Sequence, residues 1–226
     1  MQDLYTQNHS GSKPVEINKV LRNTYALLAM TMVVSAAAAA ASIALNLGHG
    51  IAIAFSISAI GILWFVLPKT ANSSAGIGVV FLFVALLGAS LGPMLSRYLG
   101  MPNGSSIIMQ ALGGTALVFF ILSGYVLTTG KDFSFMGGFL ITGLVVALLS
   151  GVAMMVAGMF GVHITGFSLA FNAVIVLLMS GLILYDTSRI VNGGETNYIM
   201  ATVSLYLNIL NLFTALLHLI GIFSDD

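Results

Sequence analysis

The segment Gly181–Phe213, GLILYDTSRIVNGGETNYIMATVSLYLNILNLF, places one carboxyl and two amides within long apolar runs. Asp186 lies near the end of the first run, and Asn208 and Asn211 lie inside the second. A charged side chain near the centre of a membrane helix costs roughly 2.5–3.5 kcal/mol on insertion scales, and the cost falls toward the helix ends. Polar groups kept in such surroundings are therefore the first candidates for a functional site.

The composition of the whole chain is that of an integral membrane protein. Of its 226 residues, 58% are hydrophobic and only 6% are charged, whereas soluble domains carry about 25% charge. Seven basic and seven acidic residues cancel, so the net charge predicts no nucleic-acid partner. The chain has no cysteine and its four histidines are scattered. We therefore predict no disulfide, no metal site and no cofactor.

The apolar runs predict an all-α membrane protein with seven spans. About 20 apolar residues are needed to cross the hydrocarbon core, and short segments with turn chemistry separate the runs. Residues 1–23 are predicted to be a disordered cytoplasmic tail, and residues 24–226 one seven-helix membrane domain. The predicted spans are at about 24–46, 50–67, 76–95, 107–128, 134–157, 166–188 and 198–221.

The basic residues predict the orientation of the bundle. With the N-terminus inside, only Arg97 falls on the outer side, so the positive-inside rule gives an N-in, C-out topology. The A-x-A patterns in Ser35–Ala41 raise the alternative of a cleaved signal peptide, but the apolar run is too long for one. The basic residues on the cytoplasmic side are then Lys13, Lys19, Arg22, Lys69, Lys131 and Arg189.

Small residues recur at four-residue spacing in two of the spans. Gly88 and Gly92 form one such pair, and Gly143, Ala147 and Gly151 repeat the step in another span. Small side chains let membrane helices approach closely. This spacing favours tight static packing over a sliding or gating surface.

The last predicted span carries a polar stripe. At 100° per residue, its polar and small residues lie within about 80° of one another. Such a stripe is costly toward lipid, so we expect the last helix to be central, with other helices around it. Hydrogen bonding between helices is the simplest role for its amides. The stripe consists of Ser204, Asn208, Asn211, Ala215 and His218.

Asp186 has two interpretations. It precedes Arg189 by three residues, so a local ion pair at the cytoplasmic interface is available. Alternatively, it is a buried carboxyl that acts as a proton or cation switch. Asn208 would lie roughly 8 Å deeper in the membrane, so the spacing alone leaves a contact with Asp186 open. Lys69, at the cytoplasmic end of its span, is a candidate counter-charge.

The sequence from Tyr185 to Phe213 resembles the signature of the transmembrane Bax inhibitor motif family, with its acid, its Glu-x-x-Tyr entry and its Ser-Leu-Tyr-Leu run. The likeness extends over most of the chain and is greatest to the enterobacterial branch, which contains an inner-membrane modulator of the FtsH protease. The stretches similar to that branch are KVLRNTYALL at 19–28, PKTAN at 68–72, ALGGTALVFF at 111–120 and YVLTTGKDFSFMGG at 125–138.

The resemblance implies a seven-helix fold with the last helix at its centre. In calcium-leak members of the family, paired aspartates on the last two helices are thought to form a pH-sensitive gate. Asp186 matches the first aspartate of that pair, whereas Asn208 stands at the second position. An Asp–Asn pair has one titratable group, so it cannot share a proton as two carboxylates do.

Two functions follow as predictions from this resemblance. The first is a modulator, and slow substrate, of the membrane-bound ATP-dependent protease FtsH, engaged through the cytoplasmic N-terminal tail in the bacterial inner membrane. The alternative is a pH-sensitive cation leak, with Ca²⁺ or H⁺ as the partner ion. We expect no enzyme activity, since no catalytic order, metal motif or phosphate loop stands out. The candidate gating or sensing residues are Asp186, Asn208, Arg189, Lys69, Asn211 and Ser204.

Overall fold

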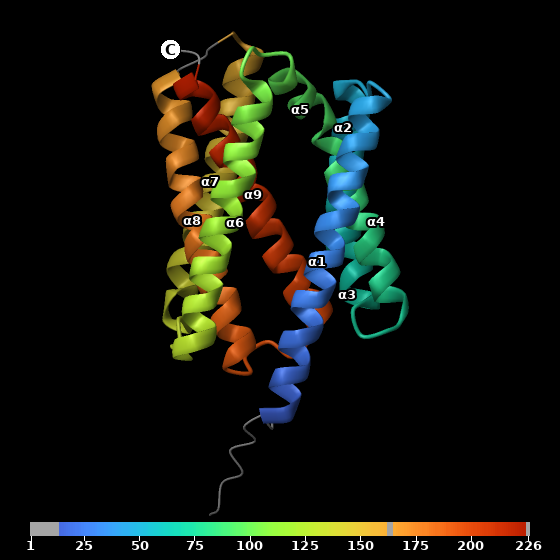
Figure 1. The fold of residues 1–226 in the computed structure, drawn as a ribbon, viewed down its shortest axis with the longest axis vertical. Coiled ribbons are helices and arrows are strands. Elements are labelled where there is room, and N and C mark those ends of the chain that lie inside the picture. Colours follow the sequence, from blue (N-terminus) through green and yellow to red (C-terminus); the bar gives the residue numbers. More distant parts are fainter. Residues whose placement is uncertain (1–13, 162–164, 225–226) are drawn as a thin grey trace, which may run out of the picture.

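The computed structural model describes residues 14–161 and 165–224, and within these ranges the chain is an upright bundle of helices (Figure 1). Seven helical segments of the described part are long and apolar enough to cross a membrane, which confirms the all-helical, seven-span prediction. The elements are α1 Pro14–Ala44, α2 His49–Gly61, η1 Ile62–Val66, α3 Leu67–Thr70, α4 Ala75–Ser90, α5 Gly92–Leu99, α6 Gly104–Thr129, η2 Ser134–Met136, α7 Gly137–Met159, α8 Thr165–Val191 and α9 Tyr198–Ser224.

The first helix begins earlier than the apolar run indicates. α1 starts at Pro14, so the prediction of a disordered tail up to residue 23 was wrong for residues 14–23. Proline is favoured in the first turn of a helix, where its missing N–H costs nothing. Glu16 in the same turn interacts favourably with the positive end of the helix dipole. Residues 1–13 of the predicted tail lie outside the described residues.

Two prolines interrupt the second and third spans. The π-helical turn η1 directly precedes α3, where Pro68 has no N–H to give to the usual carbonyl. The third span divides at Leu91 into α4 and α5, because Gly92 and Pro93 follow there. Each span thus bends at the position where its own sequence removes a backbone hydrogen bond.

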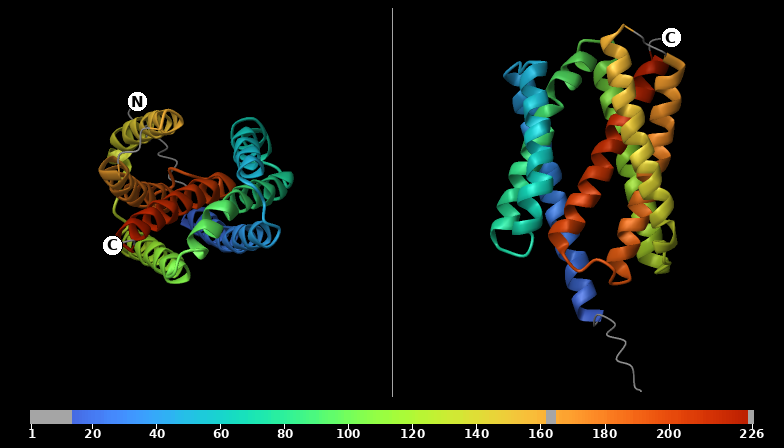
Figure 2. Two further views of the ribbon diagram at one scale, coloured as in Figure 1. Left: turned by 90° about the horizontal axis from the view of Figure 1, so that it is seen from above. Right: turned by 180° about the vertical axis from the view of Figure 1, so that it is seen from behind.

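The last helix packs against four others. α9 contacts α8, α6, α1 and α4, whereas α7 packs chiefly on α8 and η2. Figure 2 shows α7 at the periphery of the bundle when it is viewed from above. The environment of a span therefore differs sharply between α7 and α9, although both are long apolar helices.

The small residues mark close approaches between helices. A Cβ atom added at Gly88 would overlap the backbone oxygen of Ser35 in α1, and one at Gly92 would overlap the Ser42 side chain. On α7, a Cβ added at Gly143 would come within 2.9 Å of a Leu178 methyl group of α8. Gly88 and Gly92 therefore lie against α1 with no room for a larger side chain, whereas Gly143 lies against the flexible end of Leu178.

The basic residues are divided unevenly between the two ends of the bundle. The start of α1, α3 and the α8–α9 turn lie at one end, which is the lower end in Figure 1, and α5 lies at the other. Lys19, Arg22, Lys69 and Arg189 belong to the lower group of segments, whereas Arg97 belongs to α5. Basic residues are thus concentrated at the end where α1 begins.

Candidate functional site

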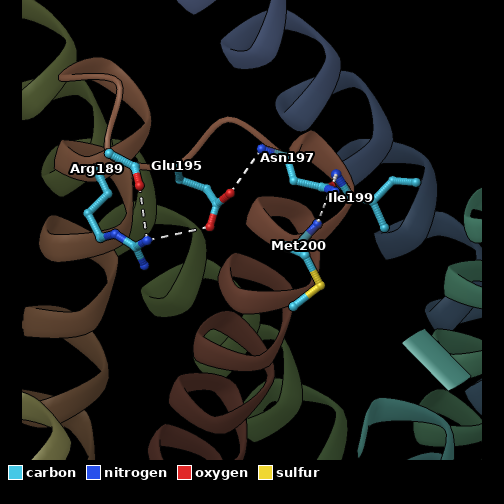
Figure 3. A network of polar contacts seen from close by, with 6 residues as sticks. Arg189, Glu195, Asn197, Ile199 and Met200 are labelled. Atoms are coloured by element: carbon cyan, nitrogen blue, oxygen red, sulfur yellow. Dashed lines mark hydrogen bonds and ion pairs between the residues drawn. The ribbon is translucent and has the colours of Figure 1, made fainter. Parts of the chain in front are cut away.

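The turn between α8 and α9 is built by its own polar side chains (Figure 3). Gly193 adopts a positive φ of 76°, which favours glycine and ends α8. The Asn197 Oδ1 atom accepts hydrogen bonds from the backbone N–H groups of Ile199 at 2.9 Å and Met200 at 3.1 Å. Asn197 is therefore the N-cap of α9, where it satisfies two otherwise unpaired donors.

The same turn is attached to the rest of the bundle. The Asn197 Nδ2 group donates to Asn72 Oδ1 at 2.7 Å and to the Ala71 carbonyl at 3.1 Å, in the segment after α3. Asn197 also donates its backbone N–H to Glu195 Oε1 at 2.9 Å. The position of α9 is thus fixed relative to both α8 and the segment after α3.

Arg189 is part of this turn. Its Nη2 atom donates to the Gly194 carbonyl at 3.1 Å and lies 3.6 Å from Glu195 Oε2 (Figure 3). Its guanidinium also lies over the Tyr185 ring, 5.7 Å from the centroid. Among the described residues, the ion pair of Arg189 is with Glu195, so the local Asp186–Arg189 ion pair considered from the sequence is not formed.

Asp186 instead contacts the last helix. Asn208 Nδ2 donates a hydrogen bond to Asp186 Oδ2 over 2.7 Å. Asn208 is only 7% exposed, so this contact joins α8 and α9 inside the bundle. The tilt of α9 against α8 and the reach of the two side chains close the depth offset that the sequence left open (Figure 1). An amide that donates to a carboxylate oxygen stabilises the carboxylate form.

The other candidate residues lie apart from this contact. Lys69 is exposed in α3, and among the described residues it makes no ion pair with Asp186. Asn211 is exposed and donates to the Leu207 carbonyl of its own helix at 2.9 Å. Ser204 is half-buried on α9. The polar stripe of α9 is therefore not buried throughout, because Asn211 faces outward. Its amide N–H group is paired with a carbonyl of its own helix.

Several buried polar contacts of the bundle were missed at the sequence level. The hydroxyl groups of Ser35 and Tyr206 lie 2.7 Å apart and join α1 to α9. Thr202 donates to the Thr24 carbonyl of α1 at 3.2 Å. Hydroxyl groups inside apolar helices were available as a signal, but they carry no charge and each can bond to its own helix. Their partners therefore become visible only in three dimensions.

No metal-binding cluster occurs in the part of the chain that the structure describes, where no three His, Asp or Glu side chains come together.

The loop before α7 contains one carboxylate with several hydrogen bonds, Asp132. It accepts from the Ser134 backbone N–H at 2.8 Å and from the Ser188 hydroxyl at 3.3 Å. Its hydrogen bonds to Ser134 are the main reason that the pKa of Asp132 lies below its usual range. This group anchors a loop to α8.

The fold and the contact between its last two spans define a polytopic α-helical membrane protein. Family comparison is more specific, since the model of the family described as "Inhibitor of apoptosis-promoting Bax1" matches residues 17–225. The chain therefore belongs to the Bax inhibitor family.

Individual relatives match over nearly their whole length. A Vibrio cholerae protein described as an uncharacterized membrane protein is 49% identical over 99% of this chain and 98% of its own. The Escherichia coli protein named modulator of FtsH protease YccA is 46% identical over 100% of both chains. A Pseudomonas aeruginosa protein is 45% identical over 98% of this chain and 97% of its own. The chain is thus similar to a named protease modulator from end to end.

Proposed function

We propose that this protein is an inner-membrane modulator, and a slow substrate, of the membrane-bound ATP-dependent protease FtsH. The observation that carries the proposal is the 46% identity with the E. coli modulator of FtsH over 100% of both chains. The aligned length includes the N-terminal segment, which is the part we assign to the protease contact. The protein acts by contact with its partner rather than by catalysis, in keeping with the modulator and inhibitor names of its relatives.

The proposed topology places the N-terminus in the cytoplasm and the C-terminus in the periplasm, with α9 at the centre of the bundle. Its support is the concentration of basic residues at the end where α1 begins, with Arg97 alone in α5 at the opposite end (Figure 1). In this topology, Lys69, Arg189 and the start of α1 all face the cytoplasm. The N-terminal residues before Pro14 are then on the side of an ATP-dependent protease.

The N-terminal segment is the proposed handle for the protease. Nine of residues 1–13 are Gln, Asp, Thr, Asn, His, Ser or Lys, a composition that favours disorder. A processive protease needs an unstructured segment on which to begin. The tail therefore determines both how the protein engages FtsH and how fast FtsH degrades it.

Deletion of residues 1–12 tests this proposal in living cells. We expect a several-fold longer half-life of the truncated protein and a changed half-life of other FtsH membrane substrates, followed by pulse-chase. The matched control carries the same twelve residues in scrambled order, which retains length and composition. Unchanged half-lives of both the truncated protein and the other substrates would overturn the proposal.

A second candidate function is a pH-sensitive cation leak, with Ca²⁺ as the ion, gated around Asp186. The observation that favours it is the hydrogen bond of 2.7 Å between Asp186 and Asn208, which joins the last two helices inside the bundle. Protonation of Asp186 would remove the charge that Asn208 binds, and would thereby loosen this contact. Hard cations prefer carboxylate ligands, and this contact provides one.

Reconstitution in liposomes with an internal calcium dye tests the leak. The expected result is a Ca²⁺ flux that depends on pH and is abolished by Asp186→Ala. Asn211→Ala is the matched control, because Asn211 is on α9 like Asn208, the partner of Asp186, but is exposed and bonds to the backbone of its own helix. No flux, or flux that neither pH nor Asp186→Ala changes, would exclude this function.

A further inference from the structure

A cavity of about 450 Å³ lies between α2, α5 and α9. We call it the α2–α5 cavity. It is at the end of the bundle opposite the α8–α9 turn, near the labels of α2 and α5 in Figure 1. Its polar lining includes Arg97 from α5, His49 from α2 and His218 from α9. Three helices that are distant in sequence thus bring basic side chains to one cavity.

The charge of the α2–α5 cavity is positive. Arg97 is exposed, and within the described ranges it makes no ion pair. No carboxylate is among the described residues that line the cavity. The two acidic residues after α9, Asp225 and Asp226, lie outside the described residues. The described lining therefore suits an anionic group.

Several hydrogen-bonding groups that line the cavity already have partners within their own helices. The Ser56 and Ser90 hydroxyl groups donate to backbone carbonyls of their own helices, at 3.1 Å and 2.7 Å. His218 Nδ1 donates to the Thr214 carbonyl at 2.7 Å, which leaves its Nε2 atom for another partner. The guanidinium of Arg97 is thus the main donor for an anion. The N-terminus of α2, which begins at His49, adds a positive dipole end beside it.

The other walls of the cavity are apolar and continue onto the surface that faces the bilayer. Ile53 and Ile57 of α2 line the cavity, yet they are 60% and 64% exposed. Pro93 and Met94 of α5 form the opposite wall. A molecule that fills this space has an anionic group at Arg97 and an apolar body along α2. A phospholipid has this combination, with its phosphate at the membrane surface.

We propose that the α2–α5 cavity is a binding site for the phosphate group of a membrane phospholipid, with Arg97 as its main ligand and with an acyl chain along Ile53 and Ile57. The site is distinct from the α8–α9 contact, and the proposal is independent of the FtsH proposal. The shared chemistry with a soluble ligand is the phosphate group, so free phosphate is the alternative source. The apolar wall of α2 favours the lipid.

Native mass spectrometry of the purified full-length protein in detergent tests the site. Phosphatidylglycerol is titrated against a diacylglycerol with the same acyl chains, which lacks the phosphoglycerol headgroup. We expect phosphatidylglycerol to bind at least about tenfold more tightly, in line with a charge-assisted hydrogen bond. Arg97→Gln should remove this preference and Arg97→Lys should retain most of it.

Arg22→Gln is the matched control, because Arg22 is an exposed cation on α1 at the other end of the bundle. It should leave the preference unchanged, and thermal unfolding of each variant verifies that it is folded. Equal binding of the two lipids, or a preference that persists in Arg97→Gln, would overturn the proposal. Displacement of the lipid by inorganic phosphate at equal concentration would also overturn it, since the ligand would then be soluble.

Discussion

Helices α7 and α9 are of similar length, but their environments are opposite. In the span Ser134–Met159, which is mostly α7, an apolar 18-residue window has a mean hydropathy of 2.5, and 6% of its residues are buried inside the protein. The corresponding window of α9 has a mean hydropathy of 1.8, and 44% of its residues are buried. In a membrane, the more apolar helix is the one that tolerates lipid on most sides. The less apolar helix needs protein neighbours for its polar groups. Hydropathy therefore locates spans, and polar residues indicate which span is packed.

The partners of the polar groups explain this difference. Tyr206 and Asn208 on α9 bond to Ser35 on α1 and Asp186 on α8. On α7, the Thr142 hydroxyl bonds to the Gly138 carbonyl of its own helix. Side chains of α9 thus bond to other helices, whereas the Thr142 hydroxyl of α7 bonds within its own helix.

The largest effect is expected at Tyr206, a side chain with 0% exposure. Tyr206→Ala should lower the free energy of unfolding by about 3 kcal/mol, because it opens a cavity and leaves Ser35 without its partner. Tyr206→Phe removes only the hydroxyl and should cost about 1 kcal/mol. Denaturation in mixed micelles measures both values.

The matched change on α7 is Phe139→Ala, at a side chain that is 76% exposed. It should alter the free energy of unfolding by less than about 0.5 kcal/mol. A loss at Phe139 as large as that at Tyr206 would contradict the contrast between the two helices.

A smaller effect is expected from one added methyl group. In Gly221→Ala on α9, the new Cβ would lie 2.6 Å from the Tyr98 ring, so the buried ring must move. Overpacking of this kind costs about 1–3 kcal/mol. In Gly138→Ala on α7, nothing lies within 4 Å of the new Cβ. That variant should be neutral or more stable by about 0.5 kcal/mol, since alanine favours helix. Thermal unfolding of the two variants in one detergent makes the comparison, and equal shifts would count against it.

The smallest effect concerns the loop that leads into α7. Hydrogen bonds from Ser134 keep the pKa of Asp132 below its usual value in the folded protein. The stabilisation is therefore complete above the unfolded pKa of an aspartate, about 3.9, and is lost as the pH falls through the lower folded value.

The measurement for this loop is the difference in Tm between the wild type and Asp132→Asn. The difference should be small and positive at neutral pH and should shrink toward zero in acid. A difference that grows as the pH falls would contradict the assigned contact. Other carboxylates titrate in both proteins, so the difference isolates Asp132.

Much of the fold could be predicted because it depends on local chemistry. The length of the apolar runs predicted the seven spans. The interruptions near Pro68 and Pro93 were not predicted, although each follows from the N–H group that the proline lacks. The start of α1 at Pro14 was not predicted, because a hydropathy criterion does not detect the polar part of a helix that continues beyond the apolar run. The polar residues that precede the apolar run continue the same helix, from Pro14 onward.

The site was predicted only in part. Asp186 and Asn208 were candidates from their cost in lipid, but their contact depends on the crossing of α8 and α9, which spacing cannot give. By spacing, an ion pair between Asp186 and Arg189 was equally possible. In the structure, Arg189 forms its ion pair with the Glu195 carboxylate of the turn instead. Whether these residues act in gating remains a prediction that the flux experiment addresses.

The Asp186–Asn208 hydrogen bond joins α8 and α9 into one unit. A double-mutant cycle with Asp186→Ala, Asn208→Ala and the double variant tests it by unfolding in mixed micelles. We expect a coupling free energy of about 0.6–1.7 kcal/mol, from the average to the largest value measured for hydrogen bonds between membrane helices. A parallel cycle with Asn211→Ala should show no coupling to Asp186. Additivity of Asp186→Ala and Asn208→Ala within about 0.3 kcal/mol would contradict the claim.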